Sequence, residues 1–179
     1  CIRYARTNGL PFLGICYGFQ AAMIEFARTC CGLKDAHTTE IEPETPHPVI
    51  CLLPEQYEVE GIGGNMRLGK RKIELLPDSL AARLYGGTAA YERFRHRYEF
   101  NPAYREVFGK NGIVFSGWAP GQPIMQIAEL PGHPFYLGVQ FHPEFTSRPV
   151  NPSPVFRGFV EACIARRSIP LSSPTGVSP

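Results

Sequence analysis

The apolar positions near the start of the chain predict a strand followed by a helix. Residues 10–15 form a short apolar run, typical of a buried strand. Residues 1–8 are interpreted as the end of a helix that stops at Asn8-Gly9. From Gly18 to Gly32 the apolar side chains recur at helical spacing, at Phe19, Ala22, Met23, Phe26, Ala27 and Cys30.

The same patterns predict alternating strands and helices farther along. Residues 34–54 and 61–69 are rich in Pro, Thr, Glu or Gly and predict irregular segments, with one short strand at 47–53. Apolar runs predict strands at 72–75, 93–100 and 113–118, and a hairpin-like pair at 123–130 and 135–141. Helices are predicted at 79–85, 102–108 and 154–166. The Ser/Pro-rich residues 168–179 predict a disordered tail.

This order of elements predicts an α/β sandwich with a central, mostly parallel sheet. A length of 179 residues fits one domain, which we assign to residues 1–167. In such folds ligands bind at the carboxyl ends of the strands. Cys16 and His142 both follow predicted strands, so we expect the functional site there.

Composition and charge narrow the function classes. The net charge of +2 is too small to indicate a nucleic-acid or membrane partner, and no apolar stretch reaches the length of a membrane span. The first residues lack the apolar core of a signal peptide, so the six cysteines are expected to be reduced thiols in a cytoplasmic protein. No Cys-x-x-Cys pair or zinc-finger spacing occurs, so no metal site is expected.

A thiol, an imidazole and a carboxylate follow one another in the sequence and are the side chains that acyl-transfer chemistry uses. Cys16 ends an apolar run between Gly14 and Gly18, the pattern of a nucleophile elbow on a sharp strand-to-helix turn. His142 ends a second apolar run, and Glu144 follows two residues later. A cysteine at a helix N-terminus beside an imidazole is expected to favour the thiolate.

Plainer interpretations compete with this one. A cysteine after an apolar strand is more often a core residue than a nucleophile, and only the flanking glycines and the His-Pro-Glu sequence favour catalysis. The basic residues at 93–97, interleaved with aromatic side chains, also suit phosphate or nucleic acid, although the small net charge of the chain argues against it. The other histidines are interpreted as structural or surface residues: His37, His47, His96 and His133.

Five separated motifs carry a family resemblance. They are Gly-Ile-Cys-Tyr-Gly-Phe-Gln at 14–20, Thr-Thr-Glu at 38–40, Gly-Gly-Asn-Met-Arg-Leu-Gly at 63–69, Arg-His-Arg-Tyr-Glu-Phe-Asn at 95–101 and Gln-Phe-His-Pro-Glu-Phe at 140–145. Together they resemble the class I glutamine amidotransferases and, within them, the glutaminase domain of the CTP synthase family. The resemblance runs in order from residue 1 to about residue 167.

The resemblance implies a glutaminase with a Cys16, His142 and Glu144 triad. Cys16 attacks the side-chain amide of L-glutamine, His142 relays the proton and Glu144 orients the imidazole, which leaves a glutamyl thioester for water to hydrolyse. The substrate contacts that the resemblance implies are the backbone at Tyr17 and Gly18, together with Phe19, Gln20, Glu40 and Arg97. Among these, Glu40 is assigned to the ammonium group of glutamine and Arg97 to its carboxylate.

Partners and cofactors outside this domain are implied as well. Ammonia passes to a synthetase domain of the same full-length chain, where ATP with Mg²⁺ activates UTP for conversion to CTP. GTP is implied as a possible activator linked to residues 63–69, and a tetramer as the full-length assembly. For the glutaminase domain itself no cofactor, nucleic acid or membrane is implied.

Two departures from the family pattern bear on activity. The family's early strands and glycine-rich oxyanion loop precede the region covered here, and loss of one oxyanion donor costs roughly a hundred- to a thousandfold in rate. A polypeptide beginning at Cys1 is therefore expected to be a poor glutaminase. Tyr17 and Phe19 replace a leucine and a methionine, which is expected to alter the pocket walls but not the role of the Tyr17 peptide N–H in oxyanion binding.

Two alternative functions stay open. One is a non-catalytic homologue that binds glutamine or a partner domain. The other is a γ-glutamyl hydrolase of the same architecture, against which Glu40 and Arg97 are taken to weigh.

Overall fold

The computed structural model describes residues 1–53 and 66–167. The helices and 3-10 turns are α1 (Ile2–Thr7), α2 (Tyr17–Thr29), α4 (Leu80–Tyr85), η1 (Pro102–Tyr104), α5 (Arg105–Lys110), η2 (Pro143–Phe145) and α6 (Pro154–Arg167). The strands are β1 (Phe12–Ile15), β2 (Ala36–Thr38), β3 (His47–Cys51), β4 (Arg67–Leu75), β5 (Ala89–His96), β6 (Glu99–Phe100), β7 (Val114–Trp118), β8 (Met125–Glu129) and β9 (Tyr136–Val139). The tail predicted at 168–179 and part of the loop predicted at 61–69 lie outside the described residues.

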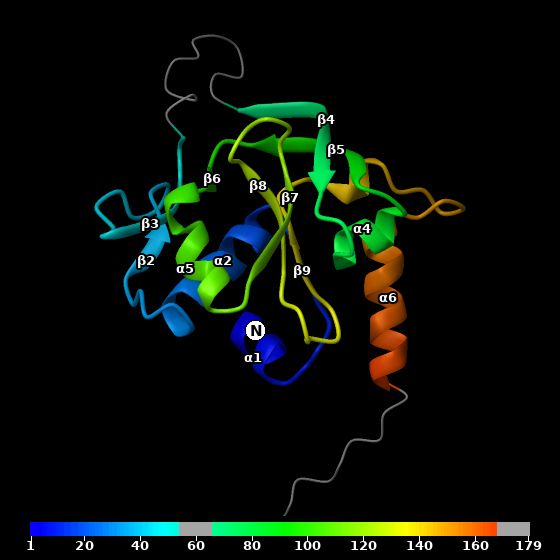
Figure 1. The fold of residues 1–179 in the computed structure, drawn as a ribbon, viewed down its shortest axis with the longest axis horizontal. Helices are drawn as coiled ribbons and strands as arrows, with labels where there is room; N and C mark the ends of the chain where they lie inside the picture. The colour runs from blue at the N-terminus through cyan, green and yellow to red at the C-terminus, as the bar shows by residue number, and fades with distance from the viewer. Residues whose placement is uncertain (54–65, 168–179) are drawn as a thin grey trace, which may run out of the picture.

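A six-stranded sheet with helices on both faces forms the body of the fold. Its strand order is β1-β9-β8-β7-β4-β5, and a smaller sheet has the order β2-β3-β6. Ala128 and Tyr136 face the hydrophobic cluster built on α2, whereas their neighbours Ile127 and Leu137 face the cluster that includes α4 and α6. Figure 1 shows α2 on one side of the sheet and α4 and α6 on the other. The predicted α/β sandwich is confirmed.

The mostly parallel sheet expected from the sequence is not what the described residues form. In the large sheet only β1 and β9 pair in parallel, and every other neighbouring pair is antiparallel. The reason is the length of the connections. Strands β7, β8 and β9 are joined by short loops that reverse the chain, whereas parallel pairing needs a long crossover such as the one that separates β1 from β9. The hairpin-like pair predicted at 123–130 and 135–141 is confirmed as β8 and β9.

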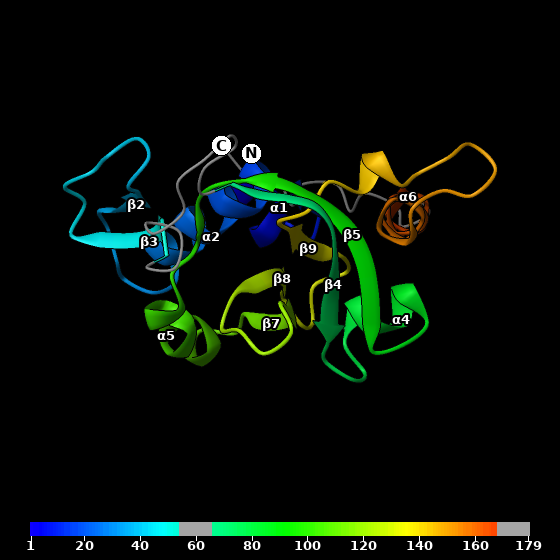
Figure 2. The ribbon, with the colours of Figure 1, turned by 90° about the horizontal axis from the view of Figure 1, so that it is seen from above.

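The long ribbon of β4 and β5 departs most from the sequence expectation. β4 begins at Arg67, within the predicted loop, and pairs along its length with β5, which ends at His96 rather than near Phe100. Figure 2 shows the two strands as a curved ribbon that arches away from the other strands. Along β5 the side chains of Ala90, Glu92, Phe94 and His96 are buried. Two polar residues, Glu92 and His96, therefore point inward.

Close packing at glycine brings the start of α2 against β1 and β9. A Cβ atom on Gly14 would lie 2.7 Å from the carbonyl oxygen of Gly18, and one on Gly138 would lie 2.8 Å from Cδ2 of Phe19. Phe19 itself is fully buried. These approaches fix the position of the turn at Cys16.

Among the residues that the structure describes, no helix has both the length and the apolar character needed to cross a membrane.

We predict that Gly14→Ala lowers the free energy of unfolding by about 1–3 kcal/mol, because the new methyl group overlaps backbone atoms of Gly18 that cannot rotate away. Gly18→Ala is the matched control, since nothing lies within 4 Å of its added Cβ and it stands in α2. It should stay within about 1 kcal/mol of the wild type. Urea denaturation measures both variants, and equal stabilities would contradict the close packing of α2 on β1.

Candidate active site

Cys16 occupies a strained turn between β1 and α2. Its φ of 51° and ψ of −104° place it in the positive-φ region, which non-glycine residues rarely adopt. The turn is held by its backbone: the Cys16 N–H donates to the carbonyl oxygen of Val139 at 2.8 Å, and the Gln20 N–H donates to that of Cys16 at 3.2 Å. The sharp strand-to-helix turn predicted at Cys16 is confirmed by this geometry, which is the backbone arrangement of a nucleophile elbow.

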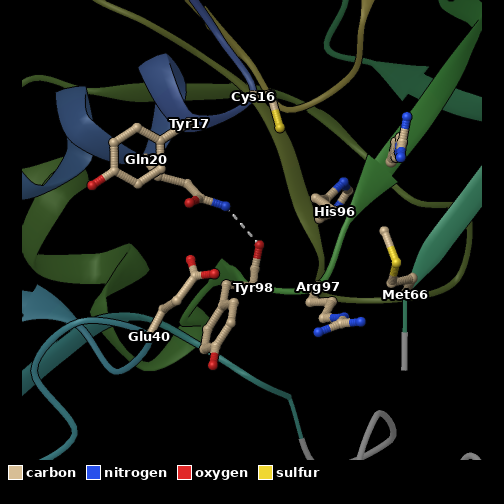
Figure 3. Close-up of a pocket in the computed structure, with 9 residues that line it drawn as sticks. Cys16, Tyr17, Gln20, Glu40, Met66, His96, Arg97 and Tyr98 are labelled. Atoms are coloured by element: carbon tan, nitrogen blue, oxygen red, sulfur yellow. Dashed lines mark hydrogen bonds between the residues drawn. The ribbon is translucent and has the colours of Figure 1, made fainter. Parts of the chain in front are cut away.

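The thiol opens into a cavity of about 310 Å³. Its lining comes from four separate stretches of the chain: Cys16, Tyr17, Gln20, Glu40, Met66, Arg95, His96, Arg97 and Tyr98. Figure 3 shows Cys16 at one end of this cavity, with the side chains of Glu40 and Arg97 toward the other. A carboxylate and a guanidinium thus lie in the same cavity as the thiol, as the substrate assignments require.

Two of the implied substrate contacts are not among the residues that line the cavity. The Phe19 side chain is fully buried and packs against Gly138, so it is not a wall of the cavity. Gly18 does not line the cavity, and its carbonyl oxygen faces Gly14. Of the two residues at the turn that differ from the family pattern, Tyr17 and Phe19, only Tyr17 therefore changes the cavity wall.

His142 and Glu144 form a close pair just beyond β9. His142 Nδ1 lies 2.6 Å from Glu144 Oε1, which leaves Nε2 as the nitrogen available for proton transfer. Nε2 is buried and has no hydrogen-bond partner among the residues that the structure describes. Neither residue lines the cavity, but β9 runs parallel to β1 with Val139 opposite Ile15, so both segments leave the sheet at the same edge.

The electrostatic surroundings of Cys16 differ from the sequence expectation. Burial raises the pKa of the Cys16 thiol, hydrogen bonds from the Tyr17 backbone and the Gln140 side chain lower it, and the carboxylates of Glu144 and Glu99 raise it, for a net rise. The favoured thiolate predicted from the helix N-terminus is thus outweighed by desolvation. A thiol with a raised pKa needs a general base before it can act as a nucleophile.

Comparison with known proteins decides the family. A family model described as "Glutamine amidotransferase class-I" matches residues 1–162. The chain belongs to the class I glutamine amidotransferases. Among the residues of this amidotransferase that the structure describes, no three His, Cys, Asp or Glu side chains gather as a metal site would need.

The relatives of this amidotransferase include long proteins named CTP synthase. The one from Thermococcus kodakarensis is 56% identical over 162 residues, which are 90% of this chain and 30% of the relative. The one from Rubrobacter xylanophilus is 57% identical over 162 residues, 90% of this chain and 29% of the relative. The chain therefore spans about a third of the length of these relatives.

A solved structure is similar over nearly the whole chain. It is the glutaminase domain of Trypanosoma brucei CTPS with bound acivicin, with a TM-score of 0.85 and 34% identity. The match covers 92% of this chain and 64% of that one. The fold predicted from the motifs, that of a class I amidotransferase glutaminase domain, is confirmed.

Sequence reasoning missed several residues of this amidotransferase site. Gln140 donates to Cys16 Sγ, and Met66, Arg95, His96 and Tyr98 line the cavity. His96 was interpreted as structural, but the alternation along β5 turns it toward the cavity. That period-two pattern, extended back to Ala90, is the signal that identifies His96 and Glu92 as inward-facing. For Gln140 the signal is its position two residues before His142.

His96 belongs to a buried cluster of polar side chains. His96 Nε2 lies 2.8 Å from Glu99 Oε1, and the Arg67 Nε lies 2.7 Å from the same oxygen. Glu99 is fully buried, so the guanidinium of Arg67 offsets a charge that would otherwise be costly. The cluster ties the start of β4 to the cavity wall.

Glu92 anchors the segment that carries the His142 and Glu144 pair. Its two carboxylate oxygens accept hydrogen bonds from the Tyr85 hydroxyl at 2.7 Å and from the Thr146 hydroxyl at 2.8 Å. The backbone N–H of His142 also donates to the carbonyl oxygen of Arg93 at 2.8 Å. Strand β5 therefore holds η2 in place from two sides.

The buried carboxyl of Glu92 predicts a pH-dependent contribution to stability. Burial raises its pKa, although hydrogen bonds from Tyr85 and Thr146 lower it. A group whose pKa is raised by folding contributes stability at low pH, and this stability is lost as the pH rises through the folded-state pKa. Glu92→Gln keeps the size and the polar atoms without the charge, so its free energy of unfolding, relative to the wild type, should increase from acidic to neutral pH.

Urea denaturation across a pH series measures this difference, with Glu106→Gln as a control of opposite sign. The hydrogen bond from Lys110 lowers the pKa of Glu106, so that variant should lose a little stability relative to the wild type as the pH rises. A relative stability of Glu92→Gln that falls with pH would contradict the account.

Proposed function

We propose that this chain hydrolyses L-glutamine through a thioester on Cys16, as the glutaminase domain of a CTP synthase. The observation that carries the proposal is the strained elbow at Cys16, which presents a thiol to a cavity that also contains Glu40 and Arg97. The His142 and Glu144 pair, beyond the neighbouring strand, supplies the base.

Acylation begins when Cys16 Sγ attacks the side-chain carbonyl carbon of glutamine. His142 Nε2 takes the thiol proton, and Glu144 stabilises the resulting imidazolium through Nδ1. The peptide N–H of Tyr17 binds the developing oxyanion. The carbon–nitrogen bond then breaks as His142 returns its proton to the leaving nitrogen, which departs as ammonia.

Deacylation repeats the steps with water. The water oxygen attacks the thioester carbon while His142 takes a proton from that water. The carbon–sulfur bond then breaks as His142 passes the proton to the sulfur. Glutamate and the free thiol result. Burial raises the pKa of the Cys16 thiol, which makes removal of its proton by a base part of the acylation step.

Charge complementarity suits a substrate with a free α-ammonium and a free α-carboxylate, as glutamine has. The Arg97 guanidinium binds the α-carboxylate and the Glu40 carboxylate binds the α-ammonium, at the end of the cavity away from Cys16. Among the alternatives, a γ-glutamyl hydrolase would use the same pair of charges, because a γ-glutamyl group keeps both α groups; the amidotransferase family and the relatives named CTP synthase favour glutamine instead. A non-catalytic homologue would need neither the strained backbone at Cys16 nor the His142 and Glu144 pair.

The wider activity follows from the relatives. The relatives are named CTP synthase, and this chain spans about a third of their length. They support the proposal that a synthetase domain takes the ammonia and converts UTP to CTP with ATP and Mg²⁺. A tetrameric full-length protein in the cytoplasm, with GTP as activator and no cofactor in the glutaminase domain, completes the proposal. Incubation of the full-length protein with UTP, ATP, Mg²⁺, GTP and glutamine tests it by the appearance of CTP.

We predict that Cys16→Ala lowers glutamine-dependent CTP formation at least about a thousandfold, because no nucleophile remains to form the thioester. CTP formation from added ammonium chloride should be unchanged, since ammonia bypasses the glutaminase step. A variant that retains glutamine-dependent activity would contradict the role of Cys16, and loss of both activities would show that the substitution harms the whole protein.

We predict that Arg97→Met lowers kcat/KM for glutamine about 10- to 100-fold, mainly through KM, because a charge-assisted hydrogen bond to the carboxylate is lost. Arg105→Met, at an exposed arginine on α5, is the matched control and should leave kcat/KM unchanged. Equal effects of the two substitutions on glutamine kinetics would contradict the assignment of Arg97.

A further inference from the structure

A chain of side-chain amides leads from the cavity wall to the sulfur of Cys16. The Gln20 Nε2 donates to the carbonyl oxygen of Tyr98 at 2.8 Å and to Gln140 Oε1 at 3.2 Å. The Gln140 Nε2 in turn donates to Cys16 Sγ at 3.7 Å. Figure 3 shows the first of these bonds, between Gln20 and Tyr98.

The backbone carbonyl of Tyr98 fixes the direction of every bond in this chain. A carbonyl oxygen only accepts hydrogen bonds, so Gln20 has to present its NH₂ group to Tyr98. The same NH₂ group contacts Gln140, which therefore has to offer its oxygen. The NH₂ group of Gln140 is then the end that faces Cys16.

Burial keeps this arrangement rigid. Gln140 is fully buried and Gln20 is 3% exposed, so water does not compete for their amide groups. Rotating either amide would set donor against donor or leave a buried polar atom without a partner, which is costly. The amide of Gln140 is thus fixed in front of the sulfur before any substrate binds.

We propose that Gln140 stabilises the thiolate of Cys16 during catalysis and is held in that role by Gln20 and the carbonyl group of Tyr98. The Tyr17 backbone N–H also donates toward the sulfur, but that N–H is the one required by the oxyanion once glutamine is attacked. Gln140 is the donor that remains with the sulfur throughout, including when the thioester breaks and the thiolate leaves. Its hydrogen bond acts against the desolvation that raises the pKa of Cys16.

The inference rests on the proposed function in taking Cys16 as the nucleophile, but its test reads thiol ionisation without glutamine turnover. The titratable groups around the same sulfur stay in place in every variant. Glu99 and Glu144 act on the sulfur by their charge, the titratable groups Glu40, Arg95, His96 and Arg97 line the same cavity, and His142 is paired with Glu144. A shift caused by Gln140 alone is therefore measured against a constant background.

The experiment is the pH dependence of Cys16 alkylation by iodoacetamide in the full-length protein. Residues 7–28 form a tryptic peptide in which Cys16 is the only cysteine, so mass spectrometry reports this thiol separately. Gln140→Met should raise the midpoint of the profile by about one pH unit and slow alkylation about tenfold at pH values below the midpoint. Gln20→Met, which frees the Gln140 amide to turn, should raise the midpoint by a smaller amount.

Gln126→Met is the matched control. Gln126 lies on β8 and is also fully buried, and its side-chain amide has no hydrogen-bond partner among the described residues. Its substitution should leave the midpoint unchanged. An unchanged midpoint in a folded Gln140→Met variant would overturn the proposal, as would an equal shift in Gln126→Met. If Gln140→Met does not fold, an unchanged midpoint in Gln20→Met would overturn it instead.

Failure of this proposal can be told apart from failure of the proposed function. If the full-length protein forms CTP from glutamine but the three variants share one midpoint, Gln140 has no role in thiolate stabilisation. If the midpoint shifts as expected but glutamine is not hydrolysed, the amide chain holds and the function assigned to the site is wrong.

Discussion

The parallel pairing of β1 with β9 is the interaction on which the site depends. Parallel strands end at the same edge of a sheet, and here Ile15 pairs with Val139 while the next N–H, that of Cys16, donates to the Val139 carbonyl. Residues more than a hundred positions apart in sequence thereby meet, with Gln140 against the Cys16 sulfur. A slip of one residue would turn alternate side chains to the other face and separate them. The antiparallel strands extend the sheet, and its helices cover both faces.

Around that pairing, packing and polar anchors hold a conformation that the chain would not adopt by itself. Cys16 stands at a positive φ and its thiol is desolvated, both of which are unfavourable. The close packing of Gly14 against Gly18 helps to hold the turn at Cys16 in this unfavourable conformation. Strand β5 supports the site at two points: Glu92 accepts a hydrogen bond from Thr146, next to the His142 segment, and His96 lines the cavity. The proposed reacting residues are thus held in position by side chains from several other elements of the fold.

Local pattern predicted the elements that bury a continuous apolar face, including the elbow, α2 and the β8 and β9 hairpin. The same reasoning failed where polar residues form structure. β4 begins among Gly, Lys and Arg residues because pairing with β5, rather than apolar burial, orders its first half. Phe19 was assigned to the substrate from its neighbours in a motif, but contact with Gly138 takes it into the core. Gln140 was missed because its contact with the site is a hydrogen bond across the sheet, which only its position two residues before His142 indicates. Strand direction was missed because it depends on the lengths of the connections.

The most direct test of the central claim is covalent labelling with an electrophilic analogue of glutamine, read by mass spectrometry of the peptide at residues 7–28. The account predicts one adduct per chain, on Cys16, and protection of that thiol by excess glutamine. Labelling that spreads over the other five cysteines, or that glutamine does not prevent, would contradict the claim that the paired ends of β1 and β9 form a glutamine site.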